Sequence, residues 1–262
     1  MVFPGQLETE PEVGPLLKAA LNGSRDPHEH SHLPVTAKEL AREAHHAVSA
    51  GADAIHLHVR NQARKESLAA DDVDRTLGAV RHACPDTPIG ISTAAWIVPD
   101  TEKRLRAVRG WQKKPDFASV NFNERGSVEL MKALLDLGIG VEIGLNDWQA
   151  AETFLASDWV DQAVRIVLQP RERDSARALE TVSEIEHELD AQRVEAPRLL
   201  HGFGPTTWPL IDIAIVRHYE TRIGLEDTLT LPDGSLARDN ADLVRVARSR
   251  RKLLRGVKGT GD

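Results

Sequence analysis

The sequence predicts a single-domain (β/α)8 barrel, that is, a TIM barrel of the α/β class. Short, nearly all-apolar runs alternate with amphipathic stretches along most of the 262 residues. Such runs fit parallel strands that are buried on both faces. Eight strand–helix units in about 250 residues are typical of this barrel. No linker or break in composition divides the chain, so we expect one domain over residues 1–262, with a short extension over about residues 1–14.

The apolar runs define the expected strands, and the stretches between them define the helices. In chain order the strands are Leu16–Leu21, Ala54–Val59, Ile89–Thr93, Phe117–Asn121, Gly140–Leu145, Arg165–Leu168, Arg198–His201 and Arg222–Glu226. The first helix begins with the capping-box spacing of Thr36 and Glu39 and ends at Gly51. The later helices cover about Ala70–His82, Glu102–Gly110, Ser127–Leu137, Asp147–Ala156, Ser175–Ala191, Thr207–His218 and Asn240–Leu254.

A doubly wound open sheet is the rival fold. It would need a glycine-rich phosphate-binding turn of the G-x-G-x-x-G type after an early strand. The first predicted strand instead runs into Asn22-Gly23-Ser24. The sequence therefore favours the closed barrel.

Composition excludes several classes of function. The net charge is −7, which argues against nonspecific nucleic-acid binding, and no apolar run is long enough for a membrane span. The N-terminal MVFPGQLETEPEVG lacks the features of a secretory signal. Cys84, the one cysteine, fits a cytoplasmic protein and is interpreted as a small buried side chain at a helix end. The basic run RSRRKLLR is interpreted as the solvated end of the last helix.

Two histidines one residue apart are the strongest functional signal. In a strand His56 and His58 project from the same face, while Leu57 points the other way. Two imidazoles on one rigid face suit a borderline metal such as zinc. Two core histidines with satisfied hydrogen bonds are the alternative interpretation.

Charged residues in apolar strands add to this signal. Glu142 lies between Val141 and Ile143, where a carboxylate is costly unless it is paired or faces a polar pocket. Arg222 and Glu226 are four residues apart on one predicted strand and would share a face, so a structural ion pair is one interpretation. The other is functional, because inward faces converge at the rim of a narrow barrel. His56, His58 and Glu226 would then supply three ligands and leave a fourth position open, as in catalytic zinc sites.

The remaining polar groups at the carboxyl ends of strands are weaker signals. Each residue of this set also has an ordinary packing or capping role: Ser92, Ser119, Asn121 and Asn146. We expect Asn146 to be the N-cap of the helix that follows it. The loop after the first strand carries His28, His30 and His32, which suggest either a second metal site or a polar loop.

Six segments together resemble a known family. They are AALNGS, HLPVTAKELAREAHHAVSAGADAIHLHVRN, GISTAAW, ASVNF, GVEIGL and RIGLEDTLTLPDGSLARDNADLV. Through them nearly the whole chain resembles the β-keto acid cleavage enzymes. The resemblance implies a (β/α)8 fold, a homotetramer, and Zn²⁺ held by His56, His58 and Glu226. It also implies that a β-keto acid is condensed with acetyl-CoA, which gives acetoacetate and a new acyl-CoA.

The resemblance also assigns roles to other residues. Asp227 would act in the general base step, assisted by Arg222. The side chains of Ser92, Ser119 and Asn121 would hold the carboxylate of the keto acid. Glu142 matches the family's glutamate on strand 5. Separately, the backbone N–H groups of Gly202 and Gly204 lie near the usual phosphate-binding corner of a barrel, where we expect them to contact CoA or simply to form a tight turn.

The chain departs from the family pattern at two places. Arg25 stands where a glutamate is usual, which argues against a cationic keto acid and permits an anionic or neutral one, with Glu29 as a possible replacement carboxylate. The family's arginine after strand 7 is also missing from Gly202-Phe203-Gly204. Two alternatives therefore stay open. One is a zinc-dependent aldolase or hydrolase that needs no CoA, and the other is a non-catalytic metal or acid binder.

Overall fold

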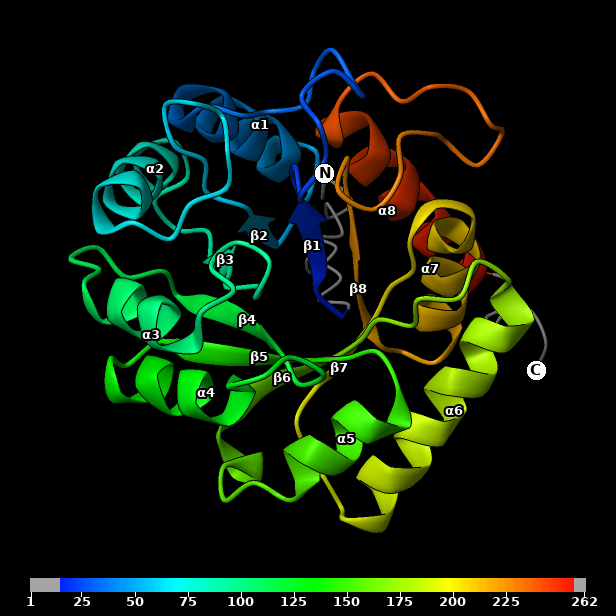
Figure 1. The fold of residues 1–262 in the computed structure, drawn as a ribbon. Helices are drawn as coiled ribbons and strands as arrows, with labels where there is room; N and C mark the ends of the chain where they lie inside the picture. Colours follow the sequence, from blue (N-terminus) through cyan, green and yellow to red (C-terminus); the bar gives the residue numbers. More distant parts are fainter. Residues whose placement is uncertain (1–14, 257–262) are drawn as a thin grey trace, which may run out of the picture.

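Eight parallel strands close into a barrel with the helices outside it (Figure 1). The computed structural model describes residues 15–256. Strand β8 closes the barrel by pairing with β1, where Lys18 lies opposite Arg222. The strands are β1 Leu17–Ala20, β2 Ala54–Leu57, β3 Ile89–Ser92, β4 Phe117–Asn121, β5 Gly140–Leu145, β6 Ala163–Leu168, β7 Arg198–Leu200 and β8 Glu220–Ile223. The predicted fold class is confirmed.

The helices follow the predicted alternation. They are α1 Ala37–Ser49, α2 Ala70–Ala83, α3 Thr101–Arg109, α4 Ser127–Asp136, α5 Trp148–Leu155, α6 Ser175–Ala191, α7 Thr207–Val216 and α8 Asn240–Gly256, with short 3₁₀ turns η1 Val160–Gln162 and η2 Gly204–Thr206. Thr36 and Glu39 form the predicted capping box of α1. The predicted N-cap Asn146 is wrong, because the side chain of Asp147 accepts the hydrogen bond from the Ala150 amide.

The largest correction concerns the last strand, which ends at Ile223 rather than at Glu226. Gly224 allows the change of direction, since a Cβ there would lie 1.9 Å from the Ala20 carbonyl oxygen. The amides of Asp227 and Thr228 both donate to the Gly224 carbonyl. Glu226 therefore stands on a tight turn that crosses the end of β1, not in a strand.

Three further sequence predictions concern residues outside the strands of the barrel. Cys84 is buried at the end of α2, as expected. The basic run is not simply solvated, because Arg248 contacts Asp53 and Arg250 contacts Asp212. The predicted extension over residues 1–14 lies outside the described residues. Across residues 15–256, no helix has the length and apolar character needed to cross a bilayer.

We predict that Gly224→Ala destabilises the fold by about 3 kcal/mol, because the new methyl group would overlap backbone rather than a flexible side chain. For a chain of this size the melting temperature should fall by about 6–12 °C. The matched control is Gly78→Ala in α2, where the Cβ meets only the mobile end of Lys113. Equal melting temperatures for the two variants would contradict this account of the turn.

Candidate metal centre and substrate pocket

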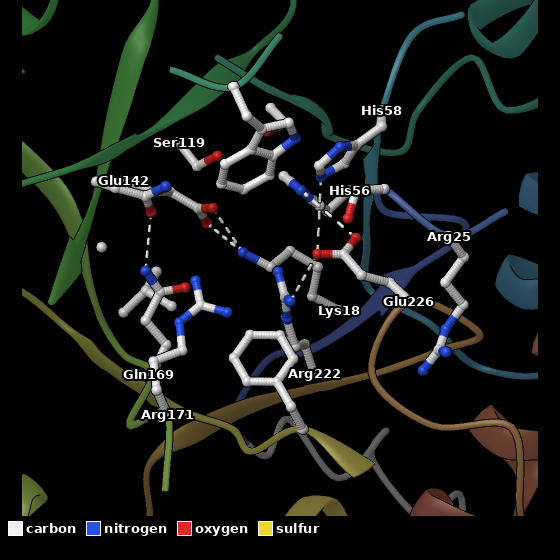
Figure 2. Close-up of a pocket in the computed structure, with 17 residues that line it drawn as sticks. Lys18, Arg25, His56, His58, Ser119, Glu142, Gln169, Arg171, Arg222 and Glu226 are labelled. Atoms are coloured by element: carbon white, nitrogen blue, oxygen red, sulfur yellow. Dashed lines mark hydrogen bonds and ion pairs between the residues drawn. The ribbon is translucent and has the colours of Figure 1, made fainter. Parts of the chain in front are cut away.

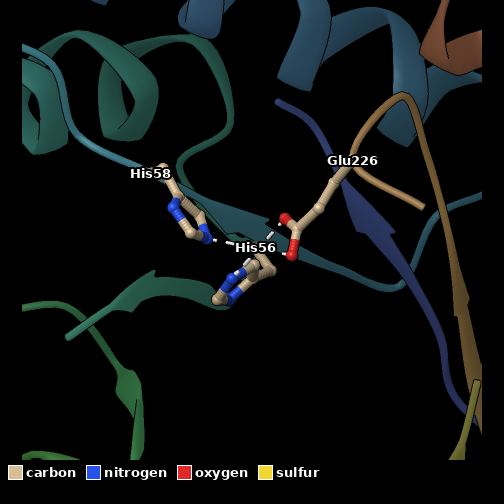
Figure 3. Close-up of side chains that lie close together, drawn as sticks. All are labelled: His56, His58 and Glu226. Carbon is tan, nitrogen blue, oxygen red and sulfur yellow. Dashed lines mark ion pairs between the residues drawn. The ribbon is translucent and has the colours of Figure 1, made fainter. Parts of the chain in front are cut away.

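The three predicted metal ligands converge at the carboxyl end of the barrel (Figure 3). Nε2 of His56 lies 3.7 Å from Oε2 of Glu226, and Nε2 of His58 lies 3.8 Å from Oε1. These separations are too long for hydrogen bonds. Two ligand atoms on a tetrahedral zinc ion are about 3.4 Å apart, so the spacing suits an ion bound between the three side chains.

The protonation states also suit a metal. Burial lowers the pKa of His56 to about 3, so the imidazole is neutral and its lone pair is free to coordinate. Burial alone would raise the pKa of Glu226, but Arg222 and the two imidazoles outweigh it and lower this pKa, which keeps the carboxylate charged. Its buried Oε2 has no hydrogen-bond partner. The neutral imidazole of His56 and the unpartnered Oε2 of Glu226 therefore suit a bound zinc ion.

The histidine loop after β1 does not form a second centre of this kind. Nε2 of His30 contacts the Ala237 carbonyl at 2.8 Å, and its Nδ1 accepts from the His32 amide. Within residues 15–256, His56, His58 and Glu226 form the one cluster with metal-ligand geometry. The polar-loop interpretation of His28, His30 and His32 is the one that the contacts support.

The β1–α1 loop and the turn after β8 bring Glu226 into place. Gly23 has φ +56, and a Cβ there would lie 2.5 Å from Cγ of Glu226. The Glu226 amide donates to the Ala20 carbonyl at 3.2 Å, which ties the turn to β1. Nη2 of Arg222 donates to Oε1 of Glu226 at 2.7 Å. A glycine is therefore needed at position 23 for this close approach.

A second carboxylate, Glu66, orients His58. Its Oε1 lies 2.5 Å from Nδ1 of His58, and its Oε2 accepts from Nε1 of Trp96, whose ring stacks on the imidazole. Because an ionised carboxylate only accepts, Nδ1 carries the proton and Nε2 is left to bind a metal. An isolated backbone bridge between Arg60 and Glu66 returns the loop to this place.

Asp227, the predicted base, lies behind Arg222 rather than in the pocket. It is fully buried, and its Oδ1 accepts from Nη2 of Arg222 at 2.7 Å. Burial raises the pKa of Asp227 to about 6, with Arg222 opposing the shift. Of these two side chains, Arg222 and not Asp227 lines the pocket.

One pocket collects all of the predicted substrate-binding residues (Figure 2). They are Arg25, Ser92, Ser119, Asn121 and Glu142. The Asn121 amide is held on both sides, since its Oδ1 accepts from Gln169 and its Nδ2 donates to Glu124.

Glu142 is already neutralised within the protein. Nζ of Lys18 lies 2.7 and 2.6 Å from its two oxygens, and Arg165 donates to Oε1 at 2.5 Å. Burial and the nearby arginines lower the pKa of Lys18 to about 8, although Glu142 opposes this shift. Glu142 therefore has two cationic partners and is not free to bind a substrate ammonium group.

Arg25 lines the pocket with its guanidinium directed to the loop. Its Nε donates to the Leu225 carbonyl, and its Nη1 donates to Glu29 at 2.8 Å. Glu29 also accepts from the Asp26 amide and is exposed outside the pocket. With these contacts Glu29 does not line the pocket, and its role as a replacement for the missing family carboxylate stays a prediction.

The two glycines proposed for CoA form a turn. The Gly204 amide donates to the Asp227 carbonyl at 2.7 Å, so it is not available to a ligand. Gly202 has no room for a side chain, because a Cβ would lie 2.5 Å from Oγ1 of Thr206. A CoA contact at Gly202 stays a prediction.

Sequence reasoning missed several residues that shape the pocket: Lys18, Glu66, Trp96, Gln169 and Arg171. Lys18 could have been found, because a lysine in the apolar strand Leu17–Ala20, like Glu142 in its strand, needs a partner or a polar pocket. Gln169 and Arg171 follow β6, a strand whose carboxyl end carries none of the predicted site residues. No sequence pattern indicates Glu66, because its contact with His58 depends on the path of the loop between them.

We predict that Glu66→Ala weakens zinc binding by about 10- to 100-fold, because His58 loses the group that fixes its ring and tautomer. The dissociation constant is measured by competition with a chromophoric chelator. Glu66→Gln keeps an acceptor for Nδ1 and should lose less affinity.

Glu195→Ala is the matched control, since this glutamate is exposed on a distant loop. An affinity for zinc that is the same in Glu66→Ala, Glu195→Ala and the unmodified protein would refute the orienting role.

Comparisons with known proteins agree with the fold and show the family. The sequence profile of the beta-keto acid cleavage enzyme family matches residues 16–156 and 173–256. The 3-keto-5-aminohexanoate cleavage enzyme of Fusobacterium nucleatum is 28% identical, over 92% of this chain and 93% of that enzyme. The enzyme of the same name from Acetoanaerobium sticklandii is 25% identical, with the same coverage.

Two solved structures share the fold at lower identity. A complex of ObcA with oxaloacetate has a TM-score of 0.68 at 18% identity and covers 88% of this chain and 68% of that one. A type I 3-dehydroquinate dehydratase from Clostridium difficile has a TM-score of 0.63 at 13% identity, with 94% of each chain covered. The profile match spans most of the sequence, so the chain belongs to the beta-keto acid cleavage enzyme family.

Proposed function

We propose that this protein is a zinc-dependent enzyme that condenses a β-keto acid with acetyl-CoA, giving acetoacetate and a new acyl-CoA. Family membership supports β-keto acid cleavage as the broader activity. The observation that carries the finer proposal is the cluster of His56, His58 and Glu226 at the wall of a cation-lined pocket. A β-keto acid is an anion that can chelate a metal, so this pocket suits it.

When bound, zinc would supply Lewis-acid polarisation of the keto acid's oxygens. The chain's own residues would hold the substrate. Ser92 and Ser119 would donate hydroxyl hydrogen bonds to its carboxylate. Asn121 uses one amide hydrogen on Glu124, which leaves the second for the same carboxylate.

Asp227 is the proton acceptor in this proposal. Its pKa of about 6, raised by burial, makes it a stronger base than an exposed aspartate. Because Arg222 lies between Asp227 and the pocket, Nη2 of Arg222 would pass one of its own protons to Oδ1 of Asp227, 2.7 Å away, and take the substrate proton in its place, so that the guanidinium keeps its charge. The proton comes from the carbon between the keto and carboxylate groups.

The reaction balances without another reactant. The acetyl group of acetyl-CoA joins the CH₂–COO⁻ fragment of the keto acid as acetoacetate, and CoA takes the remaining acyl group. A zinc-dependent aldolase or hydrolase without CoA, and a non-catalytic binder, are the alternatives that the test must separate. A homo-oligomer, either a tetramer or a dimer, and a cytoplasmic location are part of the proposal.

We predict that acetyl-CoA labelled in its acetyl group transfers the label to acetoacetate, and that a new acyl-CoA forms in equal amount. Product formation is followed by mass spectrometry after subtraction of the enzyme-free background. No product should form without acetyl-CoA. Cleavage in its absence would instead identify an aldolase or hydrolase.

Asp227→Asn should lower kcat by about 10²- to 10⁴-fold, since the general base is lost. Asp71→Asn, an exposed change on α2, is the matched control. Binding of keto acids without turnover of any of them, by enzyme replete with zinc, would favour the non-catalytic binder.

A further inference from the structure

Four cationic side chains line the pocket, and three of them already contact a carboxylate. The three pairs are Lys18–Glu142, Arg25–Glu29 and Arg222–Glu226. Their charges are therefore balanced within the protein. The fourth cation, Arg171, differs from them.

Arg171 makes no hydrogen bond or ion pair with a carboxylate among residues 15–256. Arg171 is exposed over much of its surface, but its guanidinium packs against Phe203, with Cζ 4.4 Å from the ring centroid. The Arg171 side chain also lines the pocket. Burial lowers its pKa, and the Arg222 guanidinium lowers it further. A guanidinium held beside another cation without a counter-ion favours the binding of an anion.

The pocket has no carboxylate left for a cationic substrate. Among the described residues, Glu142 and Glu226 are the two carboxylates that line it. Glu142 is held by Lys18 and Arg165, and Glu226 is held by Arg222 and belongs to the candidate metal centre. A substrate ammonium group would meet cations and no free partner.

Arg171 lies across the pocket from the candidate metal ligands, where it can contact the end of a substrate that is remote from them. Figure 2 shows Arg171 and Gln169 on one wall and His56, His58 and Glu226 on the other. Phe203 lies between the two arginines, with its ring centroid 5.7 Å from Cζ of Arg222 and 4.4 Å from that of Arg171. A keto acid bound at the metal ligands would extend its tail across this ring.

We propose that the pocket selects β-keto acids with a second, terminal carboxylate, and that Arg171 binds that carboxylate. This inference rests on the proposed function, because it names the substrate class of the same site. A planar guanidinium pairs with a carboxylate through two parallel hydrogen bonds. The reaction would then convert a keto diacid and acetyl-CoA into acetoacetate and the mono-CoA thioester of a dicarboxylic acid.

The test uses three β-keto acids of equal chain length that end in a carboxylate, a methyl group or an ammonium group. The full-length, zinc-replete enzyme should show the highest kcat/KM with the diacid. Arg171→Gln should lower the ratio of kcat/KM for the diacid to that for the methyl-ended acid by about 10- to 100-fold, mainly through the KM of the diacid. Arg173→Gln, an exposed arginine on the same loop, is the matched control and should keep the ratio.

The outcomes separate the two proposals. If the methyl- or ammonium-ended acid is cleaved as efficiently as the diacid, the substrate class is wrong while the proposed function stands. If Arg171→Gln raises the KM for acetyl-CoA and leaves that of the diacid unchanged, Arg171 serves the phosphates of CoA and the assignment is overturned. If no acid is cleaved in any arm, the proposed function fails and the selection fails with it.

Discussion

The buried guanidinium of Arg222 is the group on which the site depends. Its Nη2 contacts Glu226 and Asp227 at 2.7 Å each. Two adjacent carboxylates in a buried setting would otherwise repel each other and favour their neutral forms. With Arg222 between them, Glu226 stays charged and faces His56 and His58. The pairing of β8 with β1 fixes the position of Arg222, and the turn at Gly224 carries Glu226 back over the end of β1.

Buried charges are paired on the other side of the barrel as well. Lys18 and Arg165 both contact Glu142, so the second pocket carboxylate is neutralised as thoroughly as the first. Each of these buried ions has a partner at short distance, as the cost of burying a charge requires. Arg171 is left without such a partner within the described chain. A guanidinium without such a partner favours an anionic substrate group, and Arg25, which stands where the family has a glutamate, points in the same direction.

Sequence alone was enough for the architecture, and it named the three side chains that the structure brings together as a candidate metal centre. Short apolar strands alternating with amphipathic helices predict a closed barrel, and the H-x-H spacing of His56 and His58 puts both rings on one face. Glu226 lies near His56 and His58 as predicted, but not for the predicted reason that it belongs to strand β8. The sequence predicts Glu226 on a strand face shared with Arg222, whereas the structure places it on a turn, where it still reaches that guanidinium. Hydrophobic periodicity carries no information about such a turn.

What sequence could not give are contacts between side chains brought together by loops. Glu66 meets His58 because the loop between them folds back, and Arg171 meets Phe203 because two loops from neighbouring strands pack together. Neither contact has a fixed spacing in the chain. Asp227 illustrates the same limit, since the role that the resemblance implies for it does not fix where its side chain lies, and the turn buries it behind Arg222.

Zinc stoichiometry and affinity test the central claim most directly. Metal-free protein is reloaded with zinc, and bound metal is measured by elemental analysis beside a competing chelator. One tightly held ion per chain is expected for the unmodified protein and for His45→Ala, which changes an exposed histidine on α1. His56→Ala should lose that ion. Retention of a stoichiometric ion by His56→Ala, or no tight binding by the unmodified protein, would contradict the account.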